Sequence, residues 1–270
     1  VLKQCFDLFY EKYNQNDKST DANTLERINR FKQYIKDEGG YLDTFATYMA
    51  ISKRLGIQDS ELYSWQNWPE QYHNPLSQAV EEFKRENEKE ITFYKYIQWL
   101  IDEQLYDIFK ETLSLQMPLG IYHDLAIGSI RGGSDEWMAQ DLFAKQVSIG
   151  APPDDFNLKG QDWGLPPLIP ERLRGNGYDF FIQTLRKNMK YFGALRIDHA
   201  LGLFRLYWIP KGMTASEGAY VEYPSEDLLR IIALESVRNR TLIIAEDLGT
   251  IGEGVRESLL KFRMLSYRLL

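Results

Sequence analysis

Up to about residue 115, apolar side chains recur every three or four positions, which is the spacing of amphipathic helices. Leu2, Phe6 and Phe9 show this spacing in the first segment. Helices are predicted over residues 2–14, 21–37, 42–55 and 77–115, the last with one break. The pair Gly39-Gly40 separates the second helix from the third, and the Trp- and Pro-rich segment 64–75 predicts a loop. This part of the chain is therefore predicted to be all-helical.

After Pro118, short apolar runs alternate with helical stretches. Strands are predicted at 119–124, 194–198 and 241–246, with the start of another at Met264-Leu265. Helices are predicted near 134–144 and at 177–191, 225–239 and 252–262, and a Pro- and Gly-rich loop at 149–170. This alternation predicts an α/β fold with parallel strands and right-handed crossovers. An open doubly wound sheet and part of a (β/α)8 barrel both fit. The barrel is preferred because no strand leads directly into a glycine fingerprint.

The composition excludes some function classes. The chain has 270 residues, 32 basic and 39 acidic side chains, and a net charge of −7, which argues against nucleic-acid or anionic-membrane partners. Its single cysteine, Cys5, forms no intrachain disulfide, which fits a reducing compartment. No run approaches membrane-spanning length and no signal peptide is evident, so a cytoplasmic location is expected.

Ionisable side chains end all three predicted strands: His123-Asp124, Asp198-His199 and Glu246-Asp247. Parallel α/β folds place their chemistry at these carboxyl ends. Because strand side chains alternate, Arg196 and Asp198 should share a face, and the guanidinium would keep Asp198 ionised, as a nucleophile requires.

Glu246 follows an apolar run, so burial could raise its pKa and keep it protonated as a general acid. One ionised and one protonated carboxyl group about 5 to 5.5 Å apart form the catalytic pair of a retaining glycosidase. Two other interpretations stay open. Each strand-end acid could be a helix cap or an ion-pair partner, or the acids could hold a metal in a barrel hydrolase or aldolase. The second is weakened because the chain has only three His, one of them His73 in the helical part.

The segments RIDH (196–199) and AEDLGT (245–250) resemble the two catalytic strand motifs of 4-α-glucanotransferases, also called amylomaltases or disproportionating enzymes, of the α-amylase clan. Further matching segments lie in the family's order: WPEQYHNP (68–75), LGIYHDLAIG (119–128), GAPPD and GQDWGLPP (150–167), WIP (208–210) and GAYVEYP (218–224). The resemblance implies a partial (β/α)8 TIM barrel with a large helical insertion. Residues 1–115 would form the insertion subdomain, and residues 116–270 the central part of the catalytic barrel.

The same resemblance implies a metal-free, cofactor-free retaining transferase. Asp198 would be the nucleophile, and Glu246 the acid and then the base. Asp124, Arg196 and His199 would bind the sugar at the cleavage site, and Gln161 and Trp163 would line the glucan groove. Even without the family, Trp163 between glycines suggests an aromatic plate on a mobile loop. Tyr220 and Tyr223 are expected either to pack the loop or to contact sugar.

The expected partners are maltooligosaccharides, α-glucans derived from starch or glycogen, and glucose as an acceptor. Family members are longer than this chain and carry a third essential carboxylate in a later strand, so a central fragment is expected. Such a fragment alone would be marginally stable and inactive. The alternatives to glucan transfer are a non-catalytic glucan-binding fragment and a metal-dependent barrel enzyme.

Overall fold

The computed structural model describes residues 1–14, 21–249 and 251–267, arranged as two compact units. The helical unit comprises Val1–Leu105 and Gly132–Met138, and the sheet unit comprises Tyr106–Arg131 and Ala139–Leu270. The division into an insertion subdomain over residues 1–115 and a catalytic part over residues 116–270 stays a prediction. No helix within the described ranges is long and apolar enough to cross a lipid bilayer.

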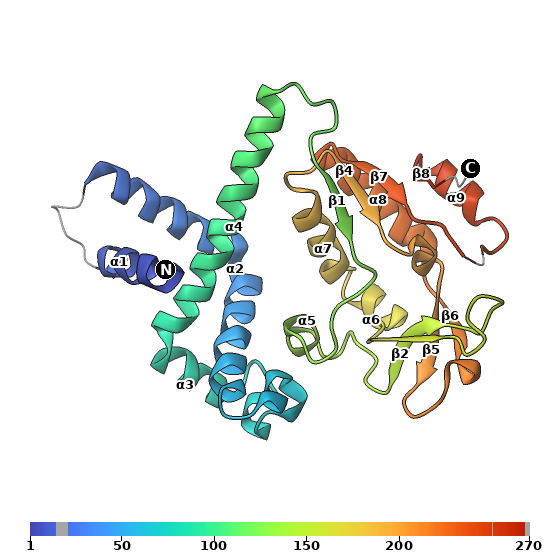
Figure 1. Ribbon diagram of the computed structural model, residues 1–270, viewed down its shortest axis with the longest axis horizontal. Helices are drawn as coiled ribbons and strands as arrows, with labels where there is room; N and C mark the ends of the chain where they lie inside the picture. The colour runs from blue at the N-terminus through green and yellow to red at the C-terminus, as the bar shows by residue number, and fades with distance from the viewer. Residues whose placement is uncertain (15–20, 250, 268–270) are drawn as a thin grey trace. The chain divides into compact units, whose positions relative to one another are not determined.

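Long helices build the helical unit (Figure 1). They are α1 (Leu2–Asn14), α2 (Ala22–Gly56), α3 (Gln78–Glu86) and α4 (Glu88–Ser114), of which α4 continues into the sheet unit. The predicted break is present inside α2, where Gly39 has a φ of 58° and a ψ of −139°. Two short 3-10 turns, Trp65–Asn67 and Glu70–Tyr72, lie in the predicted loop over 64–75, and a third, Ser60–Tyr63, directly precedes it.

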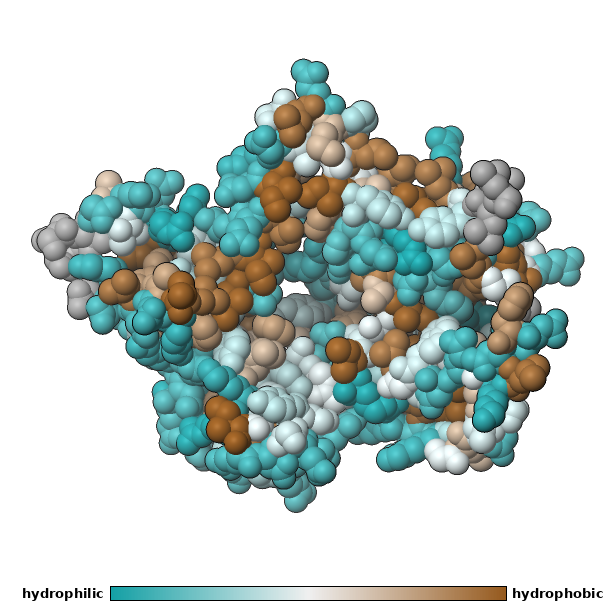
Figure 2. Space-filling model, viewed as in Figure 1, coloured by the Kyte–Doolittle hydropathy of each residue, from teal (hydrophilic) through white to brown (hydrophobic). Residues whose placement is uncertain are grey.

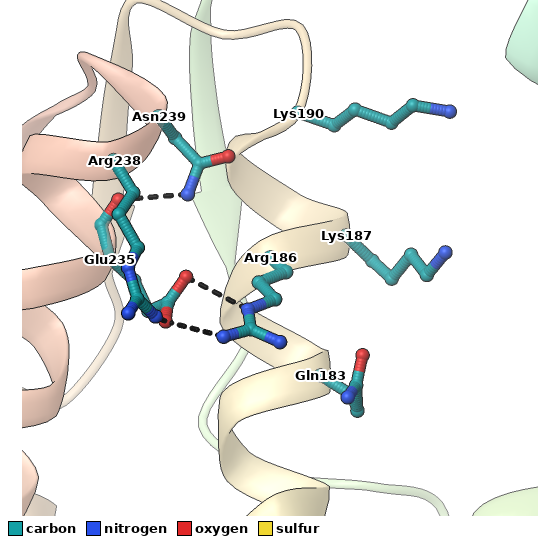
Figure 3. Close-up of a pocket in the computed structure, with 7 residues that line it drawn as sticks. All are labelled: Gln183, Arg186, Lys187, Lys190, Glu235, Arg238 and Asn239. Atoms are coloured by element: carbon teal, nitrogen blue, oxygen red, sulfur yellow. Dashed lines mark hydrogen bonds and ion pairs between the residues drawn. The ribbon is translucent and has the colours of Figure 1, made fainter.

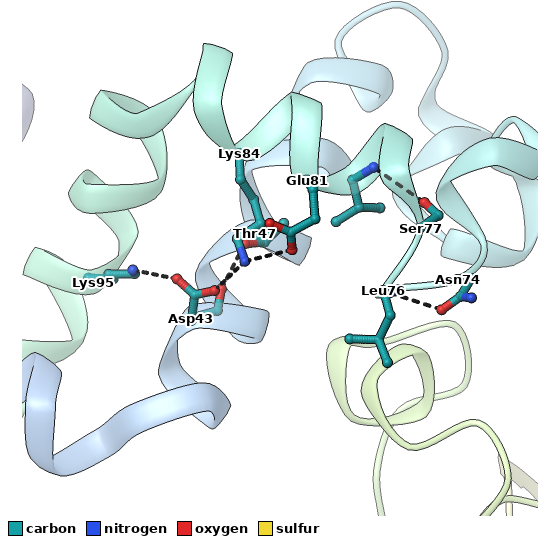
Figure 4. Close-up of polar contacts among 9 residues, drawn as sticks. Asp43, Thr47, Asn74, Leu76, Ser77, Glu81, Lys84 and Lys95 are labelled. Carbon is teal, nitrogen blue, oxygen red and sulfur yellow. Dashed lines mark hydrogen bonds and ion pairs between the residues drawn. The ribbon is translucent and has the colours of Figure 1, made fainter.

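Two buried aromatic clusters and a lysine–aspartate network hold these helices together. One cluster packs Phe6 of α1 and Phe31 of α2 against Trp99 of α4. Asp43 of α2 forms ion pairs with Lys84 of α3 at 2.8 Å and with Lys95 of α4 at 2.6 Å (Figure 4). These two lysines lower the pKa of the half-buried Asp43 despite its desolvation.

The helix α5 (Ser134–Met138) belongs to the helical unit although it lies among the strands in sequence. Trp137 is fully buried, and its ring centroid lies 5.8 Å from that of Tyr48 and 5.6 Å from that of Trp68. The helix stops at Met138, so the predicted helix over 134–144 was too long. Beyond it, Phe143 pairs with Leu168 as an isolated bridge.

Four parallel strands form the first sheet of the sheet unit, in the order β1-β4-β7-β8 (Figure 1). Their bounds are β1 (Tyr122–Leu125), β4 (Ala194–Ile197), β7 (Leu242–Ala245) and β8 (Leu265–Ser266). The crossovers contain α6 (Pro170–Gly175), α7 (Asp179–Met189), α8 (Ser225–Asn239) and α9 (Val255–Lys261). The predicted parallel strands and the helix over 225–239 are confirmed. The arrangement is consistent with part of a (β/α)8 barrel.

One face of this sheet is packed and the other is more open. Leu195 and Ile243 point into a core that includes Leu185 of α7 and Ile232 of α8. Period-two alternation then puts Arg196 on the opposite face, where its side chain is 18% exposed. Ionisable groups thus line the face that the crossover helices leave uncovered.

The helices α7 and α8 are also joined by a buried acid. Glu235 of α8 accepts two hydrogen bonds of 2.9 Å from Arg186 of α7 and one of 2.8 Å from Arg238 (Figure 3). The Arg186 contacts hold the pKa of Glu235 below its usual value. An unpaired carboxylate at this depth would be costly, so the bidentate pair fixes how the two helices pack.

A second, antiparallel sheet was not predicted. Its strands are β2 (Val147–Ala151), β3 (Gln161–Leu165), β5 (Arg205–Pro210) and β6 (Ala219–Glu222), in the order β3-β2-β5-β6. The loop predicted over 149–170 was therefore wrong. Gly150 allows close contact between β2 and β3, since an added Cβ would lie 2.0 Å from the carbonyl oxygen of Gln161.

Hydrophobic residues, brown in Figure 2, gather over the end of α4 and the segment that leads to β1. Among them, Leu113, Leu115 and Leu119 have exposed fractions of 61%, 63% and 53%. Apolar patches of this kind are typical of surfaces that associate with another surface.

At the start of β4, the backbone at Gly193 lies close to the backbone of Leu119. An added Cβ would lie 1.7 Å from the carbonyl oxygen of Leu119, so backbone must move. We expect Gly193→Ala to lower the free energy of unfolding by about 2 kcal/mol or more, measured by denaturant melts of the full-length protein. Gly175→Ala is the control, because an added Cβ there meets nothing within 4 Å. Equal stability of the two variants would contradict this reading.

Candidate active site

The strand register brings the predicted strand-end acids together in the sheet unit. Asp124 pairs with Arg196, which pairs with Ile244 on the next strand. Hydrogen bonds continue past the strands, from Asp198 N–H to Leu125 O at 3.0 Å and from Glu246 N–H to Ile197 O at 3.0 Å. Asp198 and Glu246 therefore leave adjacent strands at the same level. Adjacent strands lie about 4.8 Å apart, which allows the spacing of about 5 to 5.5 Å between the carboxyl groups of a retaining pair.

Arg196 is the charged centre of this edge. Its Nη1 lies 2.7 Å from Oδ1 of Asp124, and its Nη2 lies 2.7 Å from Oδ1 of Asp198. The hydrogen bond to Asp124, joined by that to Asp198, raises the pKa of the guanidinium above its usual value, so the group is always charged. The predicted contact between Arg196 and Asp198 is present, and Asp124 shares the same cation.

Glu246 is buried, with an exposed fraction of 8%. Its Oε2 accepts the backbone N–H of His199 at 2.9 Å, and its Oε1 accepts that of Leu248 at 2.8 Å. Each carboxyl oxygen has a second lone pair, so either can still accept a proton or a hydroxyl. The predicted protonation of Glu246 stays a prediction. Thr250, which ends the AEDLGT motif, lies outside the described residues.

His199 connects this edge to the second sheet. Its ring meets that of Trp163 edge-on, with centroids 5.2 Å apart and an interplanar angle of 81°. Trp163 Nε1 donates to Oε1 of Gln161 at 2.9 Å. These two residues lie on β3, where Trp163 packs against the core, so they do not lie on the loop that was predicted. The structure nevertheless brings Gln161, Trp163 and His199 together.

His199 is largely neutral near pH 7. Burial lowers the pKa of its imidazole, against the attraction of Glu246 and Asp198. Its backbone is in the left-handed region, with a φ of 47°, at the turn that leads into the 3-10 helix Ala200–Leu203. This turn aims the His199 N–H at Glu246.

The two other predicted aromatic candidates behave differently. Tyr223 is buried, and its hydroxyl donates to the carbonyl oxygen of Leu168 at 2.5 Å, which is a packing role. Tyr220 is 41% exposed, and the guanidinium carbon of Arg205 lies 4.0 Å from its ring centroid. Sugar contact by Tyr220 stays a prediction.

Two tyrosines near Arg196 were not predicted as site residues from the sequence. The hydroxyl groups of Tyr122 and Tyr267 lie 3.2 Å apart, and the Arg196 guanidinium carbon lies 5.6 Å from the Tyr267 ring centroid. Tyr122 was identifiable, because it precedes Asp124 by two positions on one strand face. Tyr267 follows a strand of only two residues, which gives no periodicity. No group of three or more His, Cys, Asp or Glu side chains among the described residues is arranged to hold a metal ion.

Comparison with known proteins decides the family. The family model described as 4-alpha-glucanotransferase matches residues 1–270. The chain belongs to the 4-α-glucanotransferase family. The 4-alpha-glucanotransferase of Haemophilus influenzae is 40% identical over 273 residues, which cover 100% of this chain and 38% of that protein. The chain thus spans well under half the length of this relative.

Solved structures agree with the family. The amylomaltase of Corynebacterium glutamicum matches with a TM-score of 0.77 and 31% identity, over 98% of this chain and 34% of that one. The amylomaltase of Streptococcus agalactiae, solved in complex with acarbose, matches with a TM-score of 0.79 and 22% identity, over 97% of this chain and 50% of that one. At that identity the second match supports the fold alone. The predicted α/β fold class and the family resemblance are confirmed, and the parallel sheet is consistent with part of a barrel.

The lowered pKa of His199 predicts how the stability of this family member depends on pH. The unfolded chain binds a proton at His199 near pH 6.5, whereas the folded protein binds it only at lower pH. The contribution of neutral, buried His199 to the free energy of unfolding is therefore complete above about pH 6.5. It is lost as the pH falls through the lowered pKa of His199 in the folded protein. We expect the Tm difference between pH 7.5 and pH 5 to be smaller in His199→Asn than in the wild type. Equal differences would contradict the assignment.

Proposed function

We propose that the protein is a 4-α-glucanotransferase that moves α-1,4-glucan segments between maltooligosaccharides. The observation that carries this proposal is the pair of carboxyl groups, Asp198 and Glu246, at the same level on adjacent strands with Arg196 bonded to Asp198. The family match supports it. Starch- or glycogen-derived glucans as donors, glucose as an acceptor and a cytoplasmic location belong to the same proposal.

In the first step, the Asp198 carboxylate attacks the anomeric carbon of the donor. Glu246 gives its proton to the glycosidic oxygen, and the bond from that oxygen to the anomeric carbon breaks. The products are a β-linked glycosyl ester on Asp198 and a shortened glucan with a free 4-hydroxyl. Arg196 contributes by holding Asp198 as an anion before the attack.

In the second step, the Glu246 carboxylate takes the proton of an acceptor 4-hydroxyl. The acceptor oxygen attacks the anomeric carbon and releases Asp198. Two inversions restore the α-linkage. Asp124, which forms an ion pair with Arg196, and His199, whose N–H binds Glu246, are assigned to the sugar at the cleavage site. Gln161 and Trp163 are assigned to the glucan groove beside it.

Asp198→Asn in the full-length protein tests the nucleophile. The wild type should convert maltotriose into glucose and longer chains, and the variant should lose roughly four orders of magnitude in rate while still binding maltooligosaccharide by calorimetry. Asp141→Asn, at an exposed turn position outside the strand ends that carry the site, should match the wild type. Binding without turnover by the wild type would instead support a glucan-binding protein. Wild-type rates in Asp198→Asn would refute the nucleophile.

Glu246→Gln tests the acid. This variant should stop turnover of maltotriose but react with an α-maltosyl fluoride donor, because fluoride leaves without a proton. The glycosyl-enzyme should then accumulate and be detected by intact-protein mass spectrometry. Asp198→Asn should form no such ester with the same donor. If the fluoride reacts no faster than maltotriose in Glu246→Gln, Glu246 is not the acid.

A further inference from the structure

Asp247 is a buried carboxylate that the proposed chemistry does not use. It follows Glu246 directly, so its side chain points to the other side of the chain, and its exposed fraction is 1%. Its Oδ1 accepts the backbone N–H of Tyr267 at 3.1 Å, and its Oδ2 accepts Nε of Arg256 at 3.4 Å. A carboxylate at this depth is costly unless it is paired. Asp247 thereby fixes the residue that follows β8 to the end of β7.

The Tyr267 side chain extends from this anchor to Arg196. The guanidinium carbon lies 5.6 Å from the ring centroid, within the range of cation–π attraction. At the far end of the ring, the hydroxyl contacts that of Tyr122 at 3.2 Å. The ring is therefore held at its backbone by Asp247 and at its hydroxyl by β1.

The contact between Tyr267 and Arg196 matters because Arg196 also binds two carboxylates. Its guanidinium binds both Asp124 and Asp198, and a small displacement would change the position of the attacking carboxylate. An error of about 1 Å in a reacting group can cost about 100-fold in rate. Ion pairs alone leave a long side chain several rotamers, whereas a ring beside the guanidinium removes some of them.

We propose that Tyr267, anchored by Asp247, is a positioning residue for Arg196 and, through it, for the nucleophile Asp198. This inference rests on the proposed function. The ring does the positioning, and the hydroxyl contact with Tyr122 holds the ring in place. Because Tyr267 contacts the guanidinium that holds Asp198, its loss should lower the rate of the chemical step far more than it changes substrate affinity.

The test compares variants of the full-length protein in steady-state disproportionation of maltotriose. Tyr267→Leu should lower kcat by about 10- to 100-fold and leave KM within about twofold. Tyr267→Phe keeps the ring and should recover most of that loss. The matched control is Tyr191→Leu, which removes a ring that packs on Tyr106 and Phe109 elsewhere in the sheet unit. It should lower Tm without lowering kcat.

The outcomes separate the two proposals. If the wild type does not disproportionate maltotriose, the proposed function fails. If the wild type is active, any of four results overturns the inference about Tyr267. For Tyr267→Leu these are an unchanged kcat or a KM that rises as kcat falls. The other two are a loss of kcat in Tyr191→Leu, or in Tyr267→Phe, as large as that in Tyr267→Leu. If Tyr267→Leu does not fold, Tyr267→Met is judged by the same criteria.

Discussion

The in-register pairing of three parallel strands is the constraint on which the candidate site depends. Side chains on a strand alternate between faces, so a shift of one residue in β4 would exchange Arg196 with Leu195. The core would then receive a guanidinium, and the open face would lose the cation that links Asp124 to Asp198. Burial of Leu195, Ile197 and Ile243 therefore fixes the position of the polar groups.

At the carboxyl ends of the parallel strands, the Arg196 guanidinium lies among several acidic side chains. Arg196 pairs with Asp124 and Asp198, whereas Glu246 accepts only backbone N–H groups in the described structure. The two proposed catalytic carboxyl groups thus have different environments, one beside a full positive charge and one without. Environments that differ in this way assign different roles to chemically similar acids. The neutral His199 contributes its backbone N–H without adding a competing charge.

Local patterns carried the correct predictions, and contacts between distant segments account for the errors. The period of 3.6 predicted α8, and alternation predicted the contact of Arg196 with Asp198, because both depend on neighbours in sequence. In the second sheet, β2 pairs with β5, although β3, α6, α7 and β4 lie between them in the chain. A local stretch of sequence around β2 therefore does not include the strand with which it pairs. Trp137 likewise gives no local sign that it packs with Tyr48 and Trp68. At the site, Tyr267 meets Arg196 only through the fold.

The second sheet has a consequence for the crossover segments that form it. The hairpin of β2 and β3 lies between β1 and β4 in the chain, and the hairpin of β5 and β6 lies between β4 and β7. Pairing of β2 with β5 makes one body of the two insertions. Removal of either hairpin would expose the unpaired backbone edge of the other. A change in the position of either hairpin would therefore be transmitted to the other, and to Trp163 on the edge strand β3.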